Sequence, residues 1–365
     1  MQRSSTLQSP RFGAAAALLA VGCAPSAPAA APPSPATAES TPEAGDVAAS
    51  ALPTGEQALL ASEAAGNPAA RDSEPPPPEL LRISRVSAAT RAERDHFLYL
   101  PKGYRKNSEQ RWPVLLFLHG NGERGDAKAE LDYLLKNGPL YEAWIQKRDL
   151  PFIVIAPQLP MYGMDEKADY LKKRSRAEIP ERLPTGVPDR PAEFATPSPM
   201  AGAVSEPLAK TSTPYGPPKG WPELETDLLA MLDDVLASYH GDPDRQYLTG
   251  LSYGGFGTWY LASKHPDRFA AIVPVVGYGH PDLMPSIAAA KLPIWCFAGG
   301  RDEAVKVKYF YPGLNRLEQL GHEFRFTIEA DMGHDVWARV YAGNDVFDWM
   351  LAHQKAGQSG RAVAP

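Results

Sequence analysis

Cysteine is scarce in this chain: only Cys23 and Cys296 occur among its 365 residues. Two cysteines exclude a small fold held together by several disulfides. Cys296 lies inside an apolar run, a position that predicts a small core side chain. The fold is therefore not expected to depend on a disulfide.

Clusters of basic residues are also lacking, and the formal net charge is −6. This balance argues against a nucleic-acid partner. The apolar run 12–21 is too short to span a bilayer as a mature helix. It follows Arg3 and Arg11, as the apolar region of a secretory signal follows a positively charged start.

That apolar run ends in Ala20-Val21-Gly22-Cys23. The stretch resembles the lipobox of bacterial lipoproteins, in which small residues precede a cysteine that is lipidated. The resemblance implies a signal peptide over residues 1–22 and a lipid on Cys23. It places the protein in a bacterial cell envelope, at the outer membrane or in the periplasm, attached to the membrane through that lipid. The alternative is an ordinary secretory signal followed by release.

Proline and glycine are abundant, with 38 and 30 residues respectively, which predicts linkers beside a folded part. Residues 23–80 are rich in alanine and proline and are expected to form a disordered tether. The folded domain is predicted over residues 81–355, with a disordered tail at 356–365. A proline-studded insertion at 160–218 is either a lid or a flexible insertion. Its departure from the end of a strand favours a lid.

Between these segments, strand patterns alternate with helix patterns. The continuous apolar runs 114–118 and 152–156 are typical of parallel strands buried on both faces. The alternation predicts an α/β fold, with a mostly parallel twisted sheet covered by helices on both faces. Strands are expected at 82–87, 94–100, 114–118, 152–156, 245–249, 269–276, 292–298 and 323–329, and helices at 126–138, 221–241, 255–264, 307–320 (interrupted at Pro312-Gly313) and 344–353.

The most informative stretch is Gly250-Leu251-Ser252-Tyr253-Gly254, which reads G-x-S-x-G between a predicted strand and a predicted helix. This context is what a nucleophile elbow requires, since the turn must expose the serine hydroxyl. Side chains at Gly250 and Gly254 would collide with the neighbouring strand and helix. Ser252 is therefore the candidate nucleophile.

A serine hydroxyl needs a histidine to take its proton and an acid to orient that histidine. Asp302 follows the strand pattern that ends near residue 298, and His334 follows the next strand pattern. Parallel strands bring such positions to one edge of a sheet, so Asp302 and His334 are the candidate acid and base. The rivals are His280 and His322 for the base, and Asp282, Asp331 and Glu329 for the acid.

The oxyanion that forms during acyl transfer needs two backbone donors. The amide of Tyr253, directly after the nucleophile, is one candidate. The other is the amide of Asn121, in the glycine-rich loop after the strand 114–118. In the same loop, Arg124 is a candidate to pair with Glu123 or with another acid of the loop.

Several motifs together resemble the α/β-hydrolase superfamily, and more narrowly its dienelactone-hydrolase-like and predicted-peptidase esterases. The resemblance implies a serine hydrolase with Ser252, Asp302 and His334 as its triad, and without a metal or an organic cofactor. Tyr253 stands where methionine is usual, and the insertion is longer than the family needs. The motifs are residues 94–126 with Leu-Phe-Leu-His-Gly-Asn-Gly-Glu-Arg-Gly-Asp, 155–158, 247–259 and 333–337.

The expected function is hydrolysis of small-molecule carboxylic esters through an acyl-enzyme, with no obligate protein partner. Aromatic residues near the expected mouth, Tyr215, Trp221 and Tyr253, would suit an aryl or acyl group. One alternative is a serine peptidase acting on short peptides. The other is a non-catalytic binding lipoprotein that keeps the fold.

Overall fold

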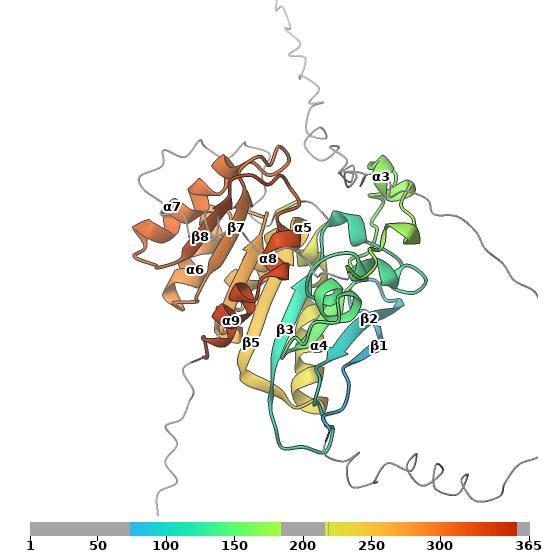
Figure 1. Cartoon of the computed structure of the whole chain (residues 1–365). Coiled ribbons are helices and arrows are strands. Elements are labelled where there is room, and N and C mark those ends of the chain that lie inside the picture. Colours follow the sequence, from blue (N-terminus) through green and yellow to red (C-terminus); the bar gives the residue numbers. More distant parts are fainter. Residues whose placement is uncertain (1–73, 184–215, 218, 356–365) are drawn as a thin grey trace, which may run out of the picture. The chain divides into compact units, whose positions relative to one another are not determined.

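The structure is a computed structural model that describes residues 74–183, 216–217 and 219–355 (Figure 1). The predicted signal peptide 1–22, Cys23, most of the tether and the tail 356–365 lie outside the described residues, as do residues 184–215 and 218 of the insertion. Within the described ranges, no helix is both long and apolar enough to cross a membrane.

An eight-stranded sheet runs through the described residues in the order β1-β2-β4-β3-β5-β6-β7-β8. β2 is antiparallel to both of its neighbours, and all other adjacent strands are parallel. The predicted α/β class is therefore confirmed. The strands are β1 Glu79–Val86, β2 Glu93–Leu100, β3 Trp112–Leu118, β4 Ile153–Pro157, β5 Gly241–Leu251, β6 Ala271–Val275, β7 Trp295–Gly299 and β8 Arg325–Glu329.

The central strands are buried on both faces, as their continuous apolar runs indicate. Every residue of β3 and β4 is buried. Side chains alternate along β3, so that Leu115 and Phe117 belong to one core cluster and Leu116 and Leu118 to the other. Cys296 of β7 is buried within the second of these clusters, as predicted.

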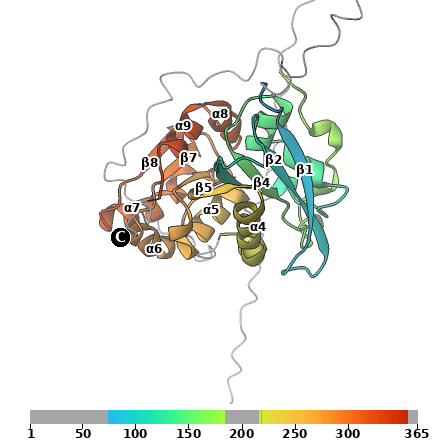
Figure 2. The same ribbon diagram turned by 90° about the horizontal axis from the view of Figure 1, so that it is seen from below.

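Helices cover each of the two faces. Figure 2 shows α4, α5, α6 and α7 on one side of the sheet and α8 and α9 on the other. The two core clusters agree with this division, since each joins one set of helices to one face. The bounds are α4 Glu225–Ser238, α5 Tyr253–Lys264, α6 Met284–Ala289, α7 Tyr311–Gln319, α8 Trp337–Ala342 and α9 Asp345–Leu351.

The helix predicted at 126–138 is wrong: this segment holds only the short 3-10 helix η3, Leu131–Leu135. The Gln158 side chain accepts from the Ala127 amide and donates to the carbonyl of Glu130. These contacts occupy backbone groups that an α-helix would pair internally. Gly138 does end the segment with φ +82°, in the left-handed region that favours glycine.

Two further features in the C-terminal half differ from the prediction. Pro312 does not interrupt a helix; it occupies the first turn of α7, where proline's missing N–H costs nothing. The short 3-10 helix η10, Val307–Tyr309, precedes it. The short helices α6 and α8 were not predicted, because six residues carry too little periodicity to be recognised.

The described beginning of the insertion, residues 160–183, forms a small ordered unit. It contains α3, Asp169–Lys172, and the 3-10 helix η5, Arg176–Glu178. Met164, Ala168 and Leu171 are buried together in a separate small apolar cluster. This part of the insertion therefore has a core of its own and can place side chains against the main domain.

Candidate active site

Ser252 lies between β5 and α5 in a strained backbone conformation, with φ +51° and ψ −113°. A non-glycine residue rarely adopts positive φ, and such residues persist where the surroundings enforce them. The Ser252 amide donates to the carbonyl of Val275 at 2.9 Å, which holds the turn against β6. The hydroxyl therefore projects from the turn at the N-terminus of α5.

The glycines of the motif make this turn possible. A β-carbon at Gly254 would overlap the carbonyl oxygen of Leu118, at the end of β3. One at Gly250 would overlap the carbonyl of Gly254 itself, across the turn. The first turn of α5 can therefore approach the sheet only with glycine at both positions.

The structure brings the three predicted residues of the triad together. The Nε2 atom of His334 lies 3.0 Å from the Ser252 hydroxyl oxygen. The Nδ1 atom of His334 lies 2.7 Å from Oδ2 of Asp302. Since a carboxylate can only accept, Nδ1 carries the proton and Nε2 presents its lone pair to the hydroxyl.

Two loops that pass very close to each other bring Asp302 and His334 together. A β-carbon at Gly299 would overlap the carbonyl oxygen of Gly333, and the Arg301 amide donates to the carbonyl of Met332 at 2.9 Å. The loops after β7 and β8 are thus locked side by side.

The carboxylate of Asp302 is buried and held at its second oxygen. Its Oδ1 atom accepts from the amides of Ala304 and Val305, each at 2.8 Å. These bonds leave Oδ2 free to face the imidazole of His334. The Asp302 carboxylate is therefore fixed in orientation.

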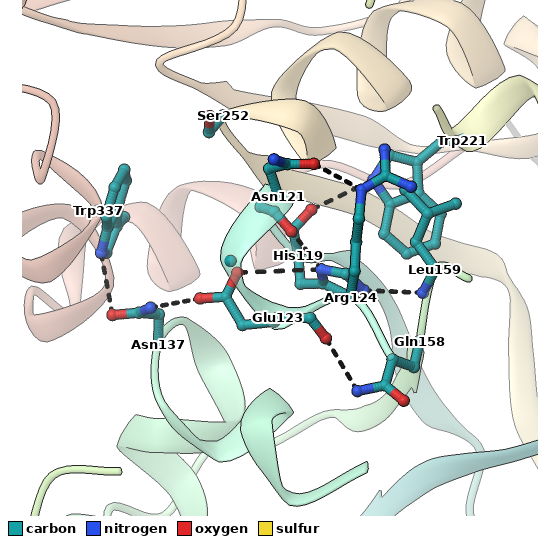
Figure 3. A network of polar contacts seen from close by, with 12 residues as sticks. His119, Asn121, Glu123, Arg124, Asn137, Gln158, Leu159, Trp221, Ser252 and Trp337 are labelled. Carbon is teal, nitrogen blue, oxygen red and sulfur yellow. Dashed lines mark hydrogen bonds and ion pairs between the residues drawn. The ribbon is translucent and has the colours of Figure 1, made fainter. Parts of the chain in front are cut away.

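A polar chain links the histidine loop to the loop after β3 (Figure 3). The Trp337 ring meets the His334 ring edge-on, with centroids 5.2 Å apart. Its indole N–H donates to Asn137 at 3.1 Å, and the Asn137 amide donates to Glu123. Glu123 is buried, which raises the pKa of its carboxyl. Neither Trp337 nor Asn137 was predicted to support the site, because nothing in their spacing indicates this contact.

The loop after β3 carries Asn121 at the start of the 3-10 helix η2, Asn121–Glu123. His119 supports this loop from below: its Nδ1 lies 2.5 Å from the Gly120 carbonyl, and its Nε2 lies 2.8 Å from the Leu159 amide. Burial lowers the pKa of His119 to about 3, so the ring is neutral. It can then donate at Nδ1 and accept at Nε2, as both contacts require.

Asn121 and Tyr253 both stand where the oxyanion prediction needs them in the chain. Tyr253 is the first residue of α5, and the first amides of a helix have no partner within it. Asn121 opens the turn at the end of β3, the strand next to β5. The two amides therefore lie at the start of α5 and in the loop after β3.

The expected pairing of Arg124 with Glu123 is wrong. The guanidinium instead donates to the side chain of Asn121 and to the carbonyls of Pro160 and Lys219. Glu123 is directed toward Asn137 and His119 on the other side of the loop (Figure 3).

Four of the five rival residues make other contacts. Nδ1 of His280 lies 3.5 Å from the carboxylate of Asp282. Asp331 and Glu329 both accept from the guanidinium of Arg339. None of these contacts involves Ser252.

The expected aromatic mouth is not formed by Trp221 or Tyr253. Both side chains are buried, with 1% and 2% of their surface exposed. Trp221 packs edge-on against His119 at 4.8 Å, below the loop after β3. Tyr215 lies outside the described residues. Trp221 and Tyr253 therefore pack inside the protein and do not line an open surface.

Among the described residues, no group of three or more histidine, cysteine, aspartate or glutamate side chains could hold a metal ion. The groups gathered at the site are a hydroxyl, an imidazole, a carboxylate and backbone amides. This set can perform nucleophilic acyl transfer.

Comparisons with known proteins agree with this architecture. Residues 223–287 match the model of the Prolyl oligopeptidase family, a segment that includes β5, Ser252 and α5. A thermostable esterase of known structure superposes with a TM-score of 0.52 at 22% identity, over 75% of this chain and 63% of that one. The chain has the α/β-hydrolase fold. The sheet order and the elbow after β5 are the parts of this hydrolase fold that place Ser252.

Two other similarities are narrower or more distant. Poly(3-hydroxyalkanoate) depolymerase C of Paucimonas lemoignei is 45% identical over 47 residues, which cover 13% of this chain and 11% of that protein. The chain thus matches only about a tenth of the length of that relative. A fluorophosphonate-binding serine hydrolase of Staphylococcus aureus superposes with a TM-score of 0.47 at 14% identity, over 75% of this chain and 99% of that one.

Proposed function

We propose that this protein is a serine hydrolase that cleaves carboxylic esters through an acyl-enzyme. The observation that carries the proposal is the continuous hydrogen-bonded path from Asp302 through His334 to Ser252, with spacings of 2.7 and 3.0 Å. Ser252 also sits in the strained turn that exposes its hydroxyl. Geometry of this kind is what an activated nucleophile needs.

In the first half-reaction, the Ser252 oxygen attacks the carbonyl carbon of the ester while Nε2 of His334 takes the hydroxyl proton. Asp302 stabilises the imidazolium that results. The carbonyl π electrons move onto oxygen, and the amides of Asn121 and Tyr253 donate to that oxyanion. When the tetrahedral intermediate collapses, the C–O bond to the alcohol breaks, and His334 returns the proton to the leaving alkoxide.

In the second half-reaction, water replaces the alcohol. Nε2 of His334 takes a proton from the water as its oxygen attacks the acyl carbon. A second tetrahedral intermediate forms at the same two amides. Its collapse breaks the bond to Ser252, and the serine oxygen recovers its proton from His334. The acid leaves, and the enzyme returns to its starting state.

An ester is the preferred substrate class, and a short peptide is the second. The 47-residue match to a poly(3-hydroxyalkanoate) depolymerase supports an ester, because such polymers are polyesters. The match of residues 223–287 to the Prolyl oligopeptidase family supports the peptide alternative. A non-catalytic binding lipoprotein is the least supported reading, because it leaves the aligned Ser252 and His334 without a purpose.

The test compares turnover of p-nitrophenyl acetate and butyrate with that of aminoacyl p-nitroanilides. We expect ester turnover to be the faster, and faster amide turnover would favour the peptidase. Ser252→Ala and His334→Ala should each lower kcat by at least about a thousandfold. His280→Ala is the matched control, since the ring of this rival histidine contacts Asp282 and is bonded to neither Ser252 nor Asp302. Near-normal turnover in either triad variant would contradict the proposed mechanism.

We further propose that the enzyme is attached to the membrane of a bacterial envelope by a lipid on Cys23. The support is the sequence Ala20-Val21-Gly22-Cys23 after a short apolar run. An anchored hydrolase would act on small esters that reach the envelope surface.

A further inference from the structure

The side chain of Arg124 has no exposed surface, and it makes three hydrogen bonds to oxygen atoms. Nε donates to Oδ1 of Asn121 at 2.5 Å, Nη1 to the carbonyl of Pro160 at 2.7 Å, and Nη2 to the carbonyl of Lys219 at 2.9 Å. Pro160 and Lys219 stand at the two ends of the inserted segment. One guanidinium therefore joins both ends of the insertion, Pro160 and Lys219, to the loop after β3.

The same guanidinium also touches the second proposed oxyanion donor. Its carbon lies 4.9 Å from the centroid of the Tyr253 ring, within the range of a cation–π contact. Arg124 thus contacts the side chains of both residues whose amides are proposed to hold the oxyanion. In Figure 3 the Asn121 side chain points toward Arg124, with Ser252 on the far side of the loop.

The described part of the insertion holds the loop after β3 from the other side. The Asn121 amide nitrogen donates to the hydroxyl of Tyr170, in α3. Arg174 donates to the carbonyls of Gly122 and Arg124. The Asn121 side chain is therefore held at its oxygen by Arg124 and at its nitrogen by Tyr170.

Burying the charged side chain of Arg124 costs free energy, and the need to fill space in the core does not explain why a charged residue stands there. Among the described residues, no carboxylate lies within ion-pair distance of this guanidinium. Burial lowers its pKa to about 10, so the charge remains at neutral pH. A desolvated cation is expensive, and an apolar side chain of similar size would fill the same space at lower cost. Its fork of donors, by contrast, can bind three oxygens at fixed angles.

We propose that Arg124 is a positioning residue that aligns both oxyanion donors and couples them, through Tyr170, Pro160 and Lys219, to the described start and end of the insertion. The inference rests on the proposed function, because it assigns Arg124 a part in stabilising the same tetrahedral intermediate. A misplacement of about 1 Å at such a site costs about a hundredfold in rate. Residues 160–183 then influence the rate of bond-making through these contacts.

The experiment compares Arg124→Lys, Tyr170→Phe and the double variant with the full-length wild type. Lysine keeps the charge and loses the fork, and phenylalanine removes only the hydroxyl that accepts from Asn121. Tyr141→Phe is the matched control, because its hydroxyl accepts an equivalent bond from the amide of Gln146 in a contact that involves neither Asn121 nor Ser252. The readouts are kcat and KM for p-nitrophenyl butyrate, and the rate at which an alkyl fluorophosphonate labels Ser252. Labelling forms an O–P bond and expels fluoride while His334 takes the proton, so it needs the oxyanion hole but no ester.

We expect Arg124→Lys to lower both kcat and the labelling rate by at least about tenfold, with KM changed less than about threefold. Tyr170→Phe should lower both rates by about threefold to tenfold, and Tyr141→Phe should lower neither. The double variant should lose less than the product of the single losses, because both changes act on Asn121. If Arg124→Lys fails to fold, Tyr170→Phe against Tyr141→Phe decides the question.

One outcome would contradict the positioning role alone, and a different outcome would contradict the proposed function. A wild type that labels normally, with Tyr170→Phe labelling as fast as Tyr141→Phe, overturns the positioning role and leaves the serine hydrolase intact. A wild type that neither labels nor turns over esters overturns the proposed function, and the positioning role falls with it.

Discussion

The backbone of Gly254 lies directly against the carbonyl oxygen of Leu118, so close that a β-carbon would overlap it. This contact joins the first turn of α5 to the end of β3, and with it the serine turn to the loop that carries Asn121. The elbow and the proposed oxyanion loop are therefore packed as one unit. Their relative position therefore requires a residue without a side chain at position 254.

Replacing Gly254 with alanine should be costly, because the added methyl meets a backbone atom that cannot rotate away. We expect Gly254→Ala to lower the free energy of unfolding by more than about 3 kcal/mol, or to prevent folding. Gly122→Ala is the control, since a β-carbon there meets nothing within 4 Å. Urea unfolding monitored by tryptophan fluorescence measures both, and equal midpoints would contradict the packing argument.

Asp302→Asn tests the orientation of the histidine. Oδ1 of the new amide would still accept from Ala304 and Val305, so its NH2 group would face Nδ1 of His334. That donor stabilises the tautomer with the proton on Nε2, which cannot accept from Ser252. We expect kcat to fall by about a thousandfold or more with little change in KM. Asp282→Asn should leave both constants unchanged, and a normal rate for Asp302→Asn would exclude it as the acid.

Two buried histidines should make the fold sensitive to acid. Burial lowers the pKa of His119 to about 3 and that of His96 to about 4. Both values lie below the ordinary 6.5, so the unfolded chain takes up protons first as the pH falls. Their stabilising effect is complete above about pH 6.5 and is lost as the pH approaches these values, at ~1.4 kcal/mol per pH unit for each histidine.

His96→Leu isolates one of these contributions. Nδ1 of His96 is buried without a hydrogen-bond partner among the described residues, so an apolar replacement loses no such bond. Between about pH 6 and pH 5, we expect the unfolding free energy of the variant to fall less steeply than that of the wild type, by ~1.4 kcal/mol per pH unit. Urea unfolding at several pH values gives the slopes, and identical slopes would refute the assignment.

Lipid attachment at Cys23 can be tested in living bacteria that process lipoproteins. We expect the wild type to incorporate a labelled fatty acid and to sediment with membranes. Cys23→Ala should lose both properties, whereas Cys296→Ala should keep the label. Label retained in Cys23→Ala would contradict the lipobox interpretation.

The strands were predictable because each contains either a run of apolar residues or an alternation of apolar and polar ones. The run before His119 and the run before Ser252 are the clearest examples, and both are central strands of the sheet. The positions of Asp302 and His334 followed from strand order, since parallel strands end at one edge. The structure places them within hydrogen-bonding distance of their expected partners.

Other features depended on contacts that spacing does not reveal. The segment 126–138 has the apolar periodicity of a helix, yet Gln158, distant in the chain, occupies its backbone groups. Glu123 or another acid of the loop was a candidate partner of Arg124, and tertiary contacts instead direct Arg124 and Glu123 to opposite sides of the loop. In both cases a long-range polar contact outweighs the local preference.

The roots of the insertion meet at one side chain, since Pro160 and Lys219 both accept from Arg124. A segment whose two attachment points share a single anchor can vary in length and composition while its entry and exit stay in place. The junctions after residue 160 and before residue 219 are therefore suitable points for exchanging this segment with counterparts from other hydrolases. Such chimeras would keep the bonds from Arg124 to both junctions, and they would need a side chain in place of Tyr170 to hold Asn121.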